Sequence, residues 1–281
     1  MEVFREIDGL RNRLLSARQN VMTIGFVPTM GALHEGHIQL IKQSVVENDT
    51  TVCSIYVNPT QFNNSEDLAH YPRNIEGDLD VLRKAGCNLV FLPSDQLMYP
   101  EGSLLGMNFG YLENILEGKF RPGHFQGVGL VVSKLFNIIM PHNAYFGRKD
   151  LQQFAIIKQM VKELFFAINL HCVDTVRAED GLALSSRNLR LSSEERLKAP
   201  LIYQVLSKAA ENLKAGMAID DTIHDAVKKL EKANCFHLEY FDVVNSDSML
   251  SIRNISSEIS CSICTALWLG KVRLIDNIQV F

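Results

Sequence analysis

The feature that most constrains this chain is the alternation of strand-like and helix-like segments from Arg5 to Val176. Short apolar runs such as Met22 to Val27 and Thr51 to Val57 alternate with segments whose apolar residues recur at helical spacing, such as Gly36 to Glu47. Strands that are apolar throughout are typical of a parallel sheet covered by helices on both faces. The pattern therefore predicts a doubly wound α/β domain.

The same reading extends along the rest of this region. Further predicted strands are Leu89 to Leu92, Ala144 to Phe146 and Leu170 to Val176, and further predicted helices are Arg5 to Gln19, Asn74 to Ala85, Gly127 to Met140 and Leu151 to Leu164.

The character of the sequence changes after Val176. A loop containing Gly and Ser leads into helical patterns over Ser193 to Lys214 and Asp220 to Lys232, followed by strand-like segments at Glu239 to Val244 and Ala266 to Leu269. We therefore predict two domains: residues 1–176, which form the doubly wound domain, and residues 177–281, which form a smaller α+β domain.

Composition excludes some classes of partner. With 281 residues, 47% of them apolar, and a net charge of -4, the chain offers a large core but no general cationic surface for nucleic acid or anionic lipid. No apolar run approaches the roughly 20 residues that span a bilayer, and the N-terminus lacks the order of a signal peptide. We expect a cytoplasmic protein that binds neither nucleic acid nor membrane.

The six cysteines are expected to be reduced. Most of them lie among apolar, strand-like residues, and only Cys261 and Cys264 form a CxxC. A zinc ribbon needs a second such pair, so a structural role in a strand is the favoured interpretation.

The segment from Val27 to His37 reads VPTMGALHEGH and joins the first buried strand of the predicted sheet to the next helix. Ligands of open parallel sheets bind beyond the carboxyl ends of the strands, and a helix N-terminus attracts phosphate. His34 and His37 lie three residues apart, so both can face a phosphate and stabilise its developing charge. The alternative is that they cap a surface turn or form half of a metal site.

Two further segments follow predicted strands or loops. Tyr56 to Phe62 includes Gln61, whose amide can both donate to and accept from a substrate with hydroxyls and a carboxylate, although an Asn-Pro turn alone would also explain the segment. Arg121 to Gly127 enters an apolar helix and brings a cation close to it, although Arg121 can equally be a solvated surface residue.

The segment from Phe146 to Gln153 is another strand end that becomes a helix. Gly147 allows close approach of a ligand to the backbone, and Lys149 is a compact charge of the kind used for phosphates. Gln153 lies one turn from Lys149 and is expected near it. For Asp150 we favour a helix-capping side chain.

The predicted domain junction, Arg177 to Asn188, combines small hydroxyl residues with Arg187. This composition suits phosphate binding, and a loop at a junction can close over a nucleotide. A simple polar linker is the alternative.

Taken together, these segments resemble the pantothenate synthetase family of the HxGH nucleotidyltransferase superfamily. Tyr71-Pro72-Arg73 and the late run Arg273 to Asn277 add to the resemblance, which spans nearly the whole chain in the family's order. In one departure, Arg148 stands where the family usually has glutamate.

The resemblance implies a Rossmann-like domain, a C-terminal lid domain and a cytoplasmic homodimer. It also implies that the enzyme activates pantoate with ATP as an acyl-adenylate and transfers it to β-alanine, giving pantothenate, AMP and pyrophosphate. Mg²⁺ is expected to bind through the phosphates, with no protein ligand identified.

Site residues follow from the resemblance by position. The catalytic residues would be His34, His37, Lys149 and Arg187, and pantoate would contact Met30, Gln61 and Gln153, with Gln61 also near β-alanine and Arg121 as a further candidate. The ATP site would comprise Met30, Gly31, Ala32, Leu33, His34, Glu35, Gly36, His37, Gly147, Arg148, Lys149, Asp150, Val176, Leu184, Ser185, Ser186 and Arg187.

Two other functions remain as rivals. A related nucleotidyltransferase acting on a phosphate-bearing substrate would need cations in place of Gln61 and Gln153. A non-catalytic nucleotide-binding protein would release no pyrophosphate with any carboxylate.

Overall fold

The computed structural model describes residues 1–254 and 260–281. Its larger sheet has six parallel strands in the order β1-β4-β3-β2-β5-β6. These strands are β1 (Glu2–Phe4), β2 (Ile24–Thr29), β3 (Thr50–Ile55), β4 (Leu89–Phe91), β5 (Asn143–Gly147) and β6 (Asn169–Val173).

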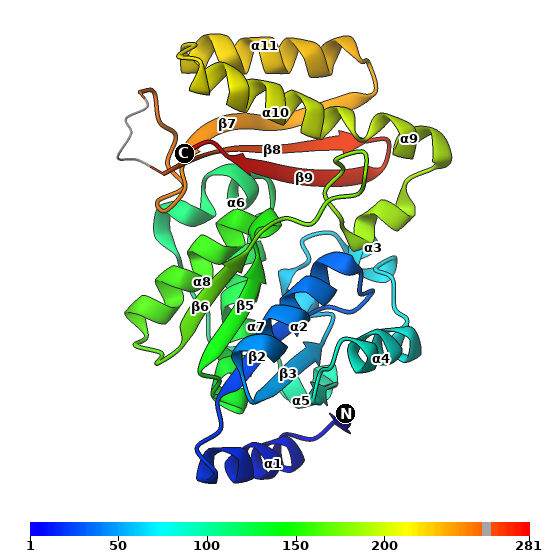
Figure 1. Cartoon of the computed structure of the whole chain (residues 1–281), viewed down its shortest axis with the longest axis vertical. Coiled ribbons are helices and arrows are strands. Elements are labelled where there is room, and N and C mark those ends of the chain that lie inside the picture. The colour runs from blue at the N-terminus through cyan, green and yellow to red at the C-terminus, as the bar shows by residue number, and fades with distance from the viewer. Residues whose placement is uncertain (255–259) are drawn as a thin grey trace.

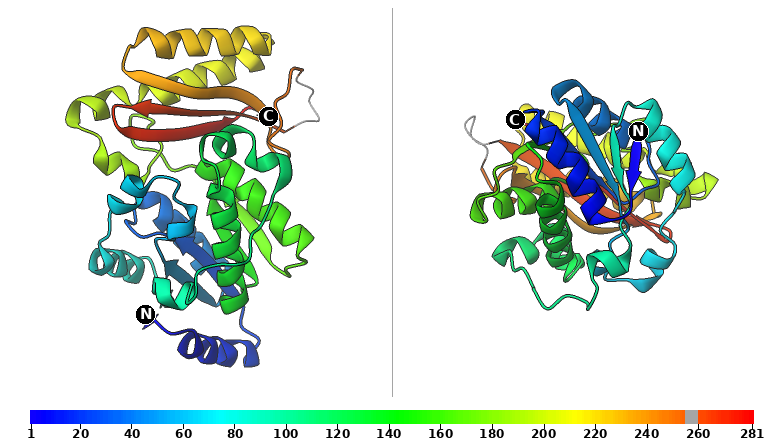
Figure 2. Two further views of the ribbon diagram at one scale, coloured as in Figure 1. Left: turned by 180° about the vertical axis from the view of Figure 1, so that it is seen from behind. Right: turned by 90° about the horizontal axis from the view of Figure 1, so that it is seen from below.

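Helices cover both faces of this sheet, as Figures 1 and 2 show. The longer ones are α1 (Ile7–Gln19), α2 (Glu35–Glu47), α4 (Ile75–Lys84), α7 (His124–Ile139) and α8 (Leu151–Glu163); the shorter ones are α3 (Ser65–Ala69), α5 (Asp95–Met98) and α6 (Leu116–Phe120). The prediction of a doubly wound α/β domain is confirmed.

The apolar strands explain why the sheet is covered on both sides. In β2, Phe26 packs into a cluster that includes α1 and α7, whereas its neighbour Val27 packs into a second cluster with α2 and α4. Val52 and Cys53 of β3 divide between the same two clusters. Because successive side chains of a strand point to opposite faces, a strand buried on both faces carries apolar or small side chains on both, the small ones in β3 being Thr and Ser.

The C-terminal part forms a separate antiparallel sheet of β7 (Phe236–Asn245), β8 (Cys261–Leu269) and β9 (Val272–Gln279). Helices α10 (Leu201–Lys214) and α11 (Ile219–Lys232) lie on the outer face of this sheet (Figure 1). The sheet's other side faces the larger domain, whereas α1 lies at the far end of the molecule (Figure 2).

Two details of the second domain differ from the predictions, and a third agrees with them. The predicted helix from Ser193 to Lys214 is two helices, α9 (Ser193–Lys198) and α10, because Pro200 lacks an N–H and stands at the N-cap of α10. Strand β8 begins at Cys261, so the CxxC lies in a buried strand as expected, and all six cysteines are free thiols. Strand β9 was not predicted, since Arg273, Asp276 and Asn277 interrupt its apolar pattern.

Candidate active site

A cavity of about 200 Å³ lies where the order of strands reverses. From β2 the chain proceeds through β3 to β4 in one direction, and later through β5 to β6 in the other. The crevice at such a switch point is the usual ligand site of an open parallel sheet. Of the predicted site residues, the cavity is lined by Met30, His34, Gly36, His37, Gln61, Gly147, Lys149, Asp150, Gln153, Val176, Leu184, Ser185, Ser186 and Arg187.

His34 and His37 lie together at the start of α2, with ring centroids 4.2 Å apart. His34 is the N-cap, and its Nδ1 accepts a hydrogen bond from the Gly36 amide at 3.2 Å. Nδ1 of His37 accepts one from the His34 amide at 3.3 Å. Since each Nδ1 is an acceptor, the proton of each neutral ring is on Nε2. The two histidines therefore cap the helix and also line the cavity, each with a fixed tautomer.

Both rings are neutral at physiological pH. Burial, followed by the charge of Lys149, lowers the pKa of His34 to about 4. Burial, followed by His34 and Lys149, lowers the pKa of His37 to about 3. The site therefore presents neutral Nε2–H donors, which supports charge stabilisation by His37 rather than donation of a proton from an imidazolium.

The residues just before His34 stabilise the turn that leads into α2. The amides of Ala32 and Leu33 donate to the buried carboxylate of Asp78 at 2.9 and 2.8 Å. Gly31 has φ +80°, and a Cβ there would lie 2.9 Å from Asp78 Oδ2, so only glycine fits this turn. These three residues and Asp78 fix the turn that presents the histidines. The carboxylate of Glu35 lies 3.6 Å from Lys42 Nζ in an exposed ion pair.

Gln61 also lines the cavity and is buried. Its Oε1 accepts from Asn58 Nδ2 at 3.1 Å, and its Nε2 contacts Met30 Sδ at 3.1 Å. Asn58 is held in turn by Tyr99, whose hydroxyl donates to it at 2.9 Å. Asn58 thus orients Gln61, a role hidden in the sequence by its appearance as an Asn-Pro turn.

Lys149 and Gln153 enter the cavity from the segment after β5. Asp150 stands at the N-cap of α8, but within the described chain its side chain makes no capping hydrogen bond, so the predicted capping role is wrong. Its carboxylate instead lies 3.7 Å from Lys149 Nζ, and the attraction of this ammonium competes with a capping geometry. Arg148 pairs with Asp174, with Nε to Oδ1 at 2.9 Å, and it is not among the residues that line the cavity.

The junction loop also lines the cavity, through Leu184 to Arg187. Arg187, in the short 3-10 helix Ser186–Arg190, donates through Nη2 to Asp67 Oδ2 at 2.8 Å, and Arg190 donates to the other oxygen of Asp67 at 2.6 Å. The hydroxyls of Tyr71 and Ser186 are 3.1 Å apart. One carboxylate shared by two guanidinium groups leaves a net positive charge, so Arg187 remains attractive to an anion.

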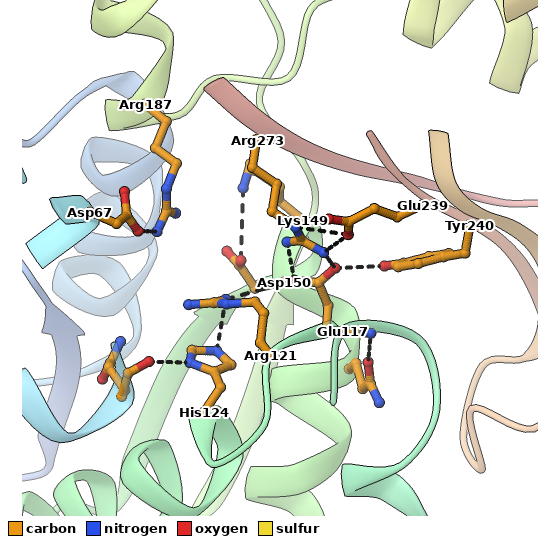
Figure 3. Close-up of polar contacts among 12 residues, drawn as sticks. Asp67, Glu117, Arg121, His124, Lys149, Asp150, Arg187, Glu239, Tyr240 and Arg273 are labelled. Carbon is orange, nitrogen blue, oxygen red and sulfur yellow. Dashed lines mark hydrogen bonds and ion pairs between the residues drawn. The ribbon is translucent and has the colours of Figure 1, made fainter. Parts of the chain in front are cut away.

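Arg121 lies in an adjoining recess of about 940 Å³ between the domains, which it lines together with Lys149 and Arg187 (Figure 3). Its side chain is 14% exposed, so the solvated alternative is wrong. Arg121 Nη1 donates to His124 Nε2 at 3.0 Å, and His124 Nδ1 donates to the Gln61 carbonyl at 2.8 Å. A buried, neutral histidine thus links Arg121 to the backbone of Gln61.

An apolar wall completes the cavity and was not predicted as part of the site. It consists of Val128, Val131, Val132 and Leu135 on α7. These residues continue the apolar stripe of α7 that faces the core. The sequence therefore does not distinguish the apolar residues that line the cavity from those that only pack in the core.

The neutral histidines predict a loss of stability in acid. Burial, followed by Arg121, lowers the pKa of His124 to about 3, while an unfolded histidine ionises near 6.5. The unfolded chain therefore takes up a proton first, and the stabilisation present above about pH 6.5 declines as the pH falls toward 3. We expect His124 to account for a loss of about 2 kcal/mol between pH 7.5 and pH 5.

Urea unfolding of the wild type and of His124→Gln at both pH values measures this loss. The variant should show the smaller decrease in the free energy of unfolding. Equal decreases in the two proteins would contradict the assignment of a neutral, buried His124.

Within residues 1–254 and 260–281, no three His, Cys, Asp or Glu side chains are grouped so that they could hold a metal ion. None of the helices in this described part is both long and apolar enough to cross a bilayer.

Known proteins match the chain over its whole length. The family profile described as Pantoate-beta-alanine ligase matches residues 2–279. Pantothenate synthetase of Porphyromonas gingivalis is 44% identical over 279 residues, covering 99% of each chain, and that of Gluconobacter oxydans is 43% identical over 281 residues, covering 100% of each.

Solved structures agree with this match. The crystal structure of pantothenate synthetase from Thermus thermophilus superimposes with a TM-score of 0.94 at 39% identity, covering 100% of both chains. A Francisella tularensis pantoate-beta-alanine ligase, described as complexed with Beta-gamma ATP and Beta-alanine, has a TM-score of 0.84 at 37% identity, covering 100% of this chain and 98% of its own. The chain therefore belongs to the pantoate–β-alanine ligase family, whose members are called pantothenate synthetases.

Proposed function

We propose that this enzyme condenses (R)-pantoate with β-alanine through a pantoyl-adenylate, consuming ATP and releasing AMP and pyrophosphate. The observation that carries the proposal is the composition of the cavity at the β2/β5 switch point. The cavity is lined by two neutral histidines and two cations, and also by two glutamines and an apolar wall. The first set suits polyphosphate, and the second suits a small, branched, hydroxylated carboxylate.

In the first step, a carboxylate oxygen of pantoate attacks the α-phosphorus of ATP, and the bond from that phosphorus to pyrophosphate breaks. Negative charge grows on the phosphate oxygens during this transfer, and the fixed Nε2–H groups of His34 and His37 are available to donate to them. Lys149 and Arg187 neutralise the phosphates. No covalent protein nucleophile is needed, so the task of the protein is positioning and charge stabilisation.

In the second step, the amine of β-alanine attacks the acyl carbon and AMP leaves, while the amine gives up its extra proton. Gln61 lies beside the acyl group in this arrangement, and Arg121 lies in the recess that adjoins the cavity.

The nucleotide would lie against bare backbone as well as side chains. In the described structure, a Cβ added to Gly147 would meet nothing within 4 Å, so the cavity has room beside this residue. Ser185 and Ser186 add hydroxyls to the same wall, beside Val176 and Leu184. Mg²⁺ bound by the phosphates would neutralise further charge, in keeping with its habit of binding through phosphates and water.

Pyrophosphate exchange tests the adenylate directly. With pantoate and ATP but no β-alanine, labelled pyrophosphate should enter ATP, because formation of the adenylate is reversible. A nucleotidyltransferase that acts on a phosphate-bearing substrate, or a non-catalytic nucleotide-binding protein, would show no pantoate-dependent exchange.

Gln61→Glu should impair the binding of pantoate specifically. The substitution keeps the size of the side chain but places a negative charge next to the substrate carboxylate. Each tenfold loss of affinity for pantoate corresponds to about 1.4 kcal/mol of repulsion. We expect the KM for pantoate to rise about 10- to 100-fold and the KM for ATP to change less than about threefold. Gln204→Glu, on the exposed side of α10, is the control and should change neither value.

The family resemblance further supports a cytoplasmic homodimer. Light scattering on the eluted protein should give twice the mass of one chain, and a monomer mass would contradict this part of the proposal.

A further inference from the structure

Strand β9 belongs to the second domain, yet three of its polar side chains reach the elements that form the active site. Arg273 donates two hydrogen bonds to Glu117 of α6, each at 2.7 Å. Asp276 accepts two from Arg177, at 2.7 and 2.9 Å, where the junction loop begins. Asn277 contacts the segment that carries Lys149. These three residues are the ones that interrupt the apolar pattern of the strand.

Asn277 donates through Nδ2 to two backbone carbonyls, those of Arg148 and Lys149, both at 2.9 Å. The last register pair of β5 with β6 is Gly147 with Val173, so the sheet no longer holds the backbone after Gly147. The amide of Asn277 therefore fixes the chain at the point where it leaves the sheet and carries Lys149 into the cavity.

The other atom of this amide is its oxygen. Its Oδ1 is buried and has no hydrogen-bond partner among the described residues. An unsatisfied buried acceptor costs roughly 1–3 kcal/mol. Exchanging the two ends of the amide would place its oxygen against two carbonyl oxygens, so the observed orientation is the one that the contacts favour.

The neighbouring contacts of β9 make its position rigid. Glu117 also accepts from Tyr240 at 2.9 Å, and Arg273 also pairs with Glu239 (Figure 3). Although burial alone would raise the pKa of Glu117, the hydrogen bonds and charge of Arg273 hold it at about 2, so the carboxylate stays ionised. Asn277 thus extends from a strand that Arg273 ties to α6 of the first domain and that Asp276 ties to the start of the junction loop.

We propose that Asn277 is a positioning residue that holds Lys149 at the nucleotide phosphates. This inference rests on the proposed role of Lys149 in binding ATP. Arg273 and Asp276 contribute to the same positioning, because they fix the strand from which Asn277 extends.

Titration of the full chain with ATP alone tests the proposal without either of the other substrates. Asn277→Ala should weaken ATP binding about tenfold or more, because the backbone before and after Lys149 loses two hydrogen bonds that orient it. Asn143→Ala is the matched control, since it removes side-chain hydrogen bonds from the opposite end of β5. It should change ATP affinity less than about threefold.

A double-mutant cycle separates positioning from a general effect on folding. In a Lys149→Ala background, Asn277→Ala should have little further effect on ATP affinity, since the group that it positions is gone. Additive losses, or unchanged affinity in a folded Asn277→Ala protein, would overturn the proposal.

Asn277→Asp provides a variant of the same shape if the alanine variant does not fold. An ionised carboxylate would repel both carbonyls, whereas a protonated one can donate to one of them. The ATP affinity of Asn277→Asp relative to that of the wild type should therefore improve from pH 8 to pH 6. If this ratio of affinities does not depend on pH, the result counts against the proposal. If the wild type binds ATP but shows no pantoate-dependent pyrophosphate exchange, the proposed function is refuted. The ATP affinities of the Asn277 variants can still be compared in that case, so the role of Asn277 is tested independently.

Discussion

Replacing His37 by alanine is expected to slow pantoate-dependent pyrophosphate exchange by about a hundredfold or more, the usual effect of losing a preorganised transition-state donor. The Nδ1 atom of His37 is occupied by the His34 amide, so its Nε2–H is the group available to the phosphate. Because the pKa of His37 is lowered to about 3, mainly by burial, this donor is present throughout the neutral range. The effect should appear chiefly in kcat, since the interaction strengthens as charge develops.

His224→Ala is the control for this experiment. His224 is exposed on α11 in the second domain, and its loss should leave the exchange rate within about twofold of the wild type. Full exchange activity in a folded His37→Ala protein would remove His37 from the mechanism.

Replacing Lys149 by alanine is expected to lower kcat/KM for ATP by about a hundredfold or more, equivalent to about 3 kcal/mol of lost stabilisation. The ammonium lies in a side chain that is only 15% exposed, where its attraction to phosphate is screened less than in water. Its nearest carboxylate, Asp150, is 3.7 Å away and does not approach as closely as a hydrogen-bonded partner would. Lys149→Arg keeps the charge but replaces a compact ammonium by a planar group and should restore activity only in part.

Lys158→Ala is the matched control for Lys149. Lys158 lies on α8, which follows Lys149, but its ammonium is exposed and pairs with Asp247 at 2.8 Å. An exposed pair of this kind contributes little, so kinetic constants should stay within about twofold of the wild type. Similar losses of kcat/KM for ATP in the two lysine variants would mean that the overall positive charge of the protein, rather than the position of Lys149, attracts ATP.

The larger domain was predictable because its signals are local and repeated. Buried strands such as Ile24–Thr29 and helices with clear apolar stripes such as Glu35–Glu47 each carry their own pattern, and their alternation determines the class of sheet. Strand ends in such a sheet converge, which is why His37, Gln61 and Lys149 were expected at one site before any contact was known. The structure brings these three residues together around one cavity.

The parts that sequence reasoning missed depend on contacts between distant residues. Asn58 orients Gln61 only because Tyr99 and the Gly127 carbonyl meet it, and both are far away in sequence. Strand β9 has polar residues where a core strand should be apolar, and two of them, Arg273 and Asn277, have partners in the other domain. A local pattern cannot show which polar residue has a buried partner.

The second domain also differs from a lid joined by a linker alone. A buried ion pair from Arg273 to Glu117 connects it to the wall of the recess that Arg121 lines, and Asn277 contacts the segment of Lys149. The surface between the two domains is therefore part of the site rather than only a cover for it.

Release of AMP from ATP, measured with pantoate and β-alanine added separately and then together, tests the central claim most directly. The proposed reaction predicts sustained release of AMP and pyrophosphate in equal amounts only when both substrates are present. Sustained AMP release with either substrate alone, or none with both, would contradict it.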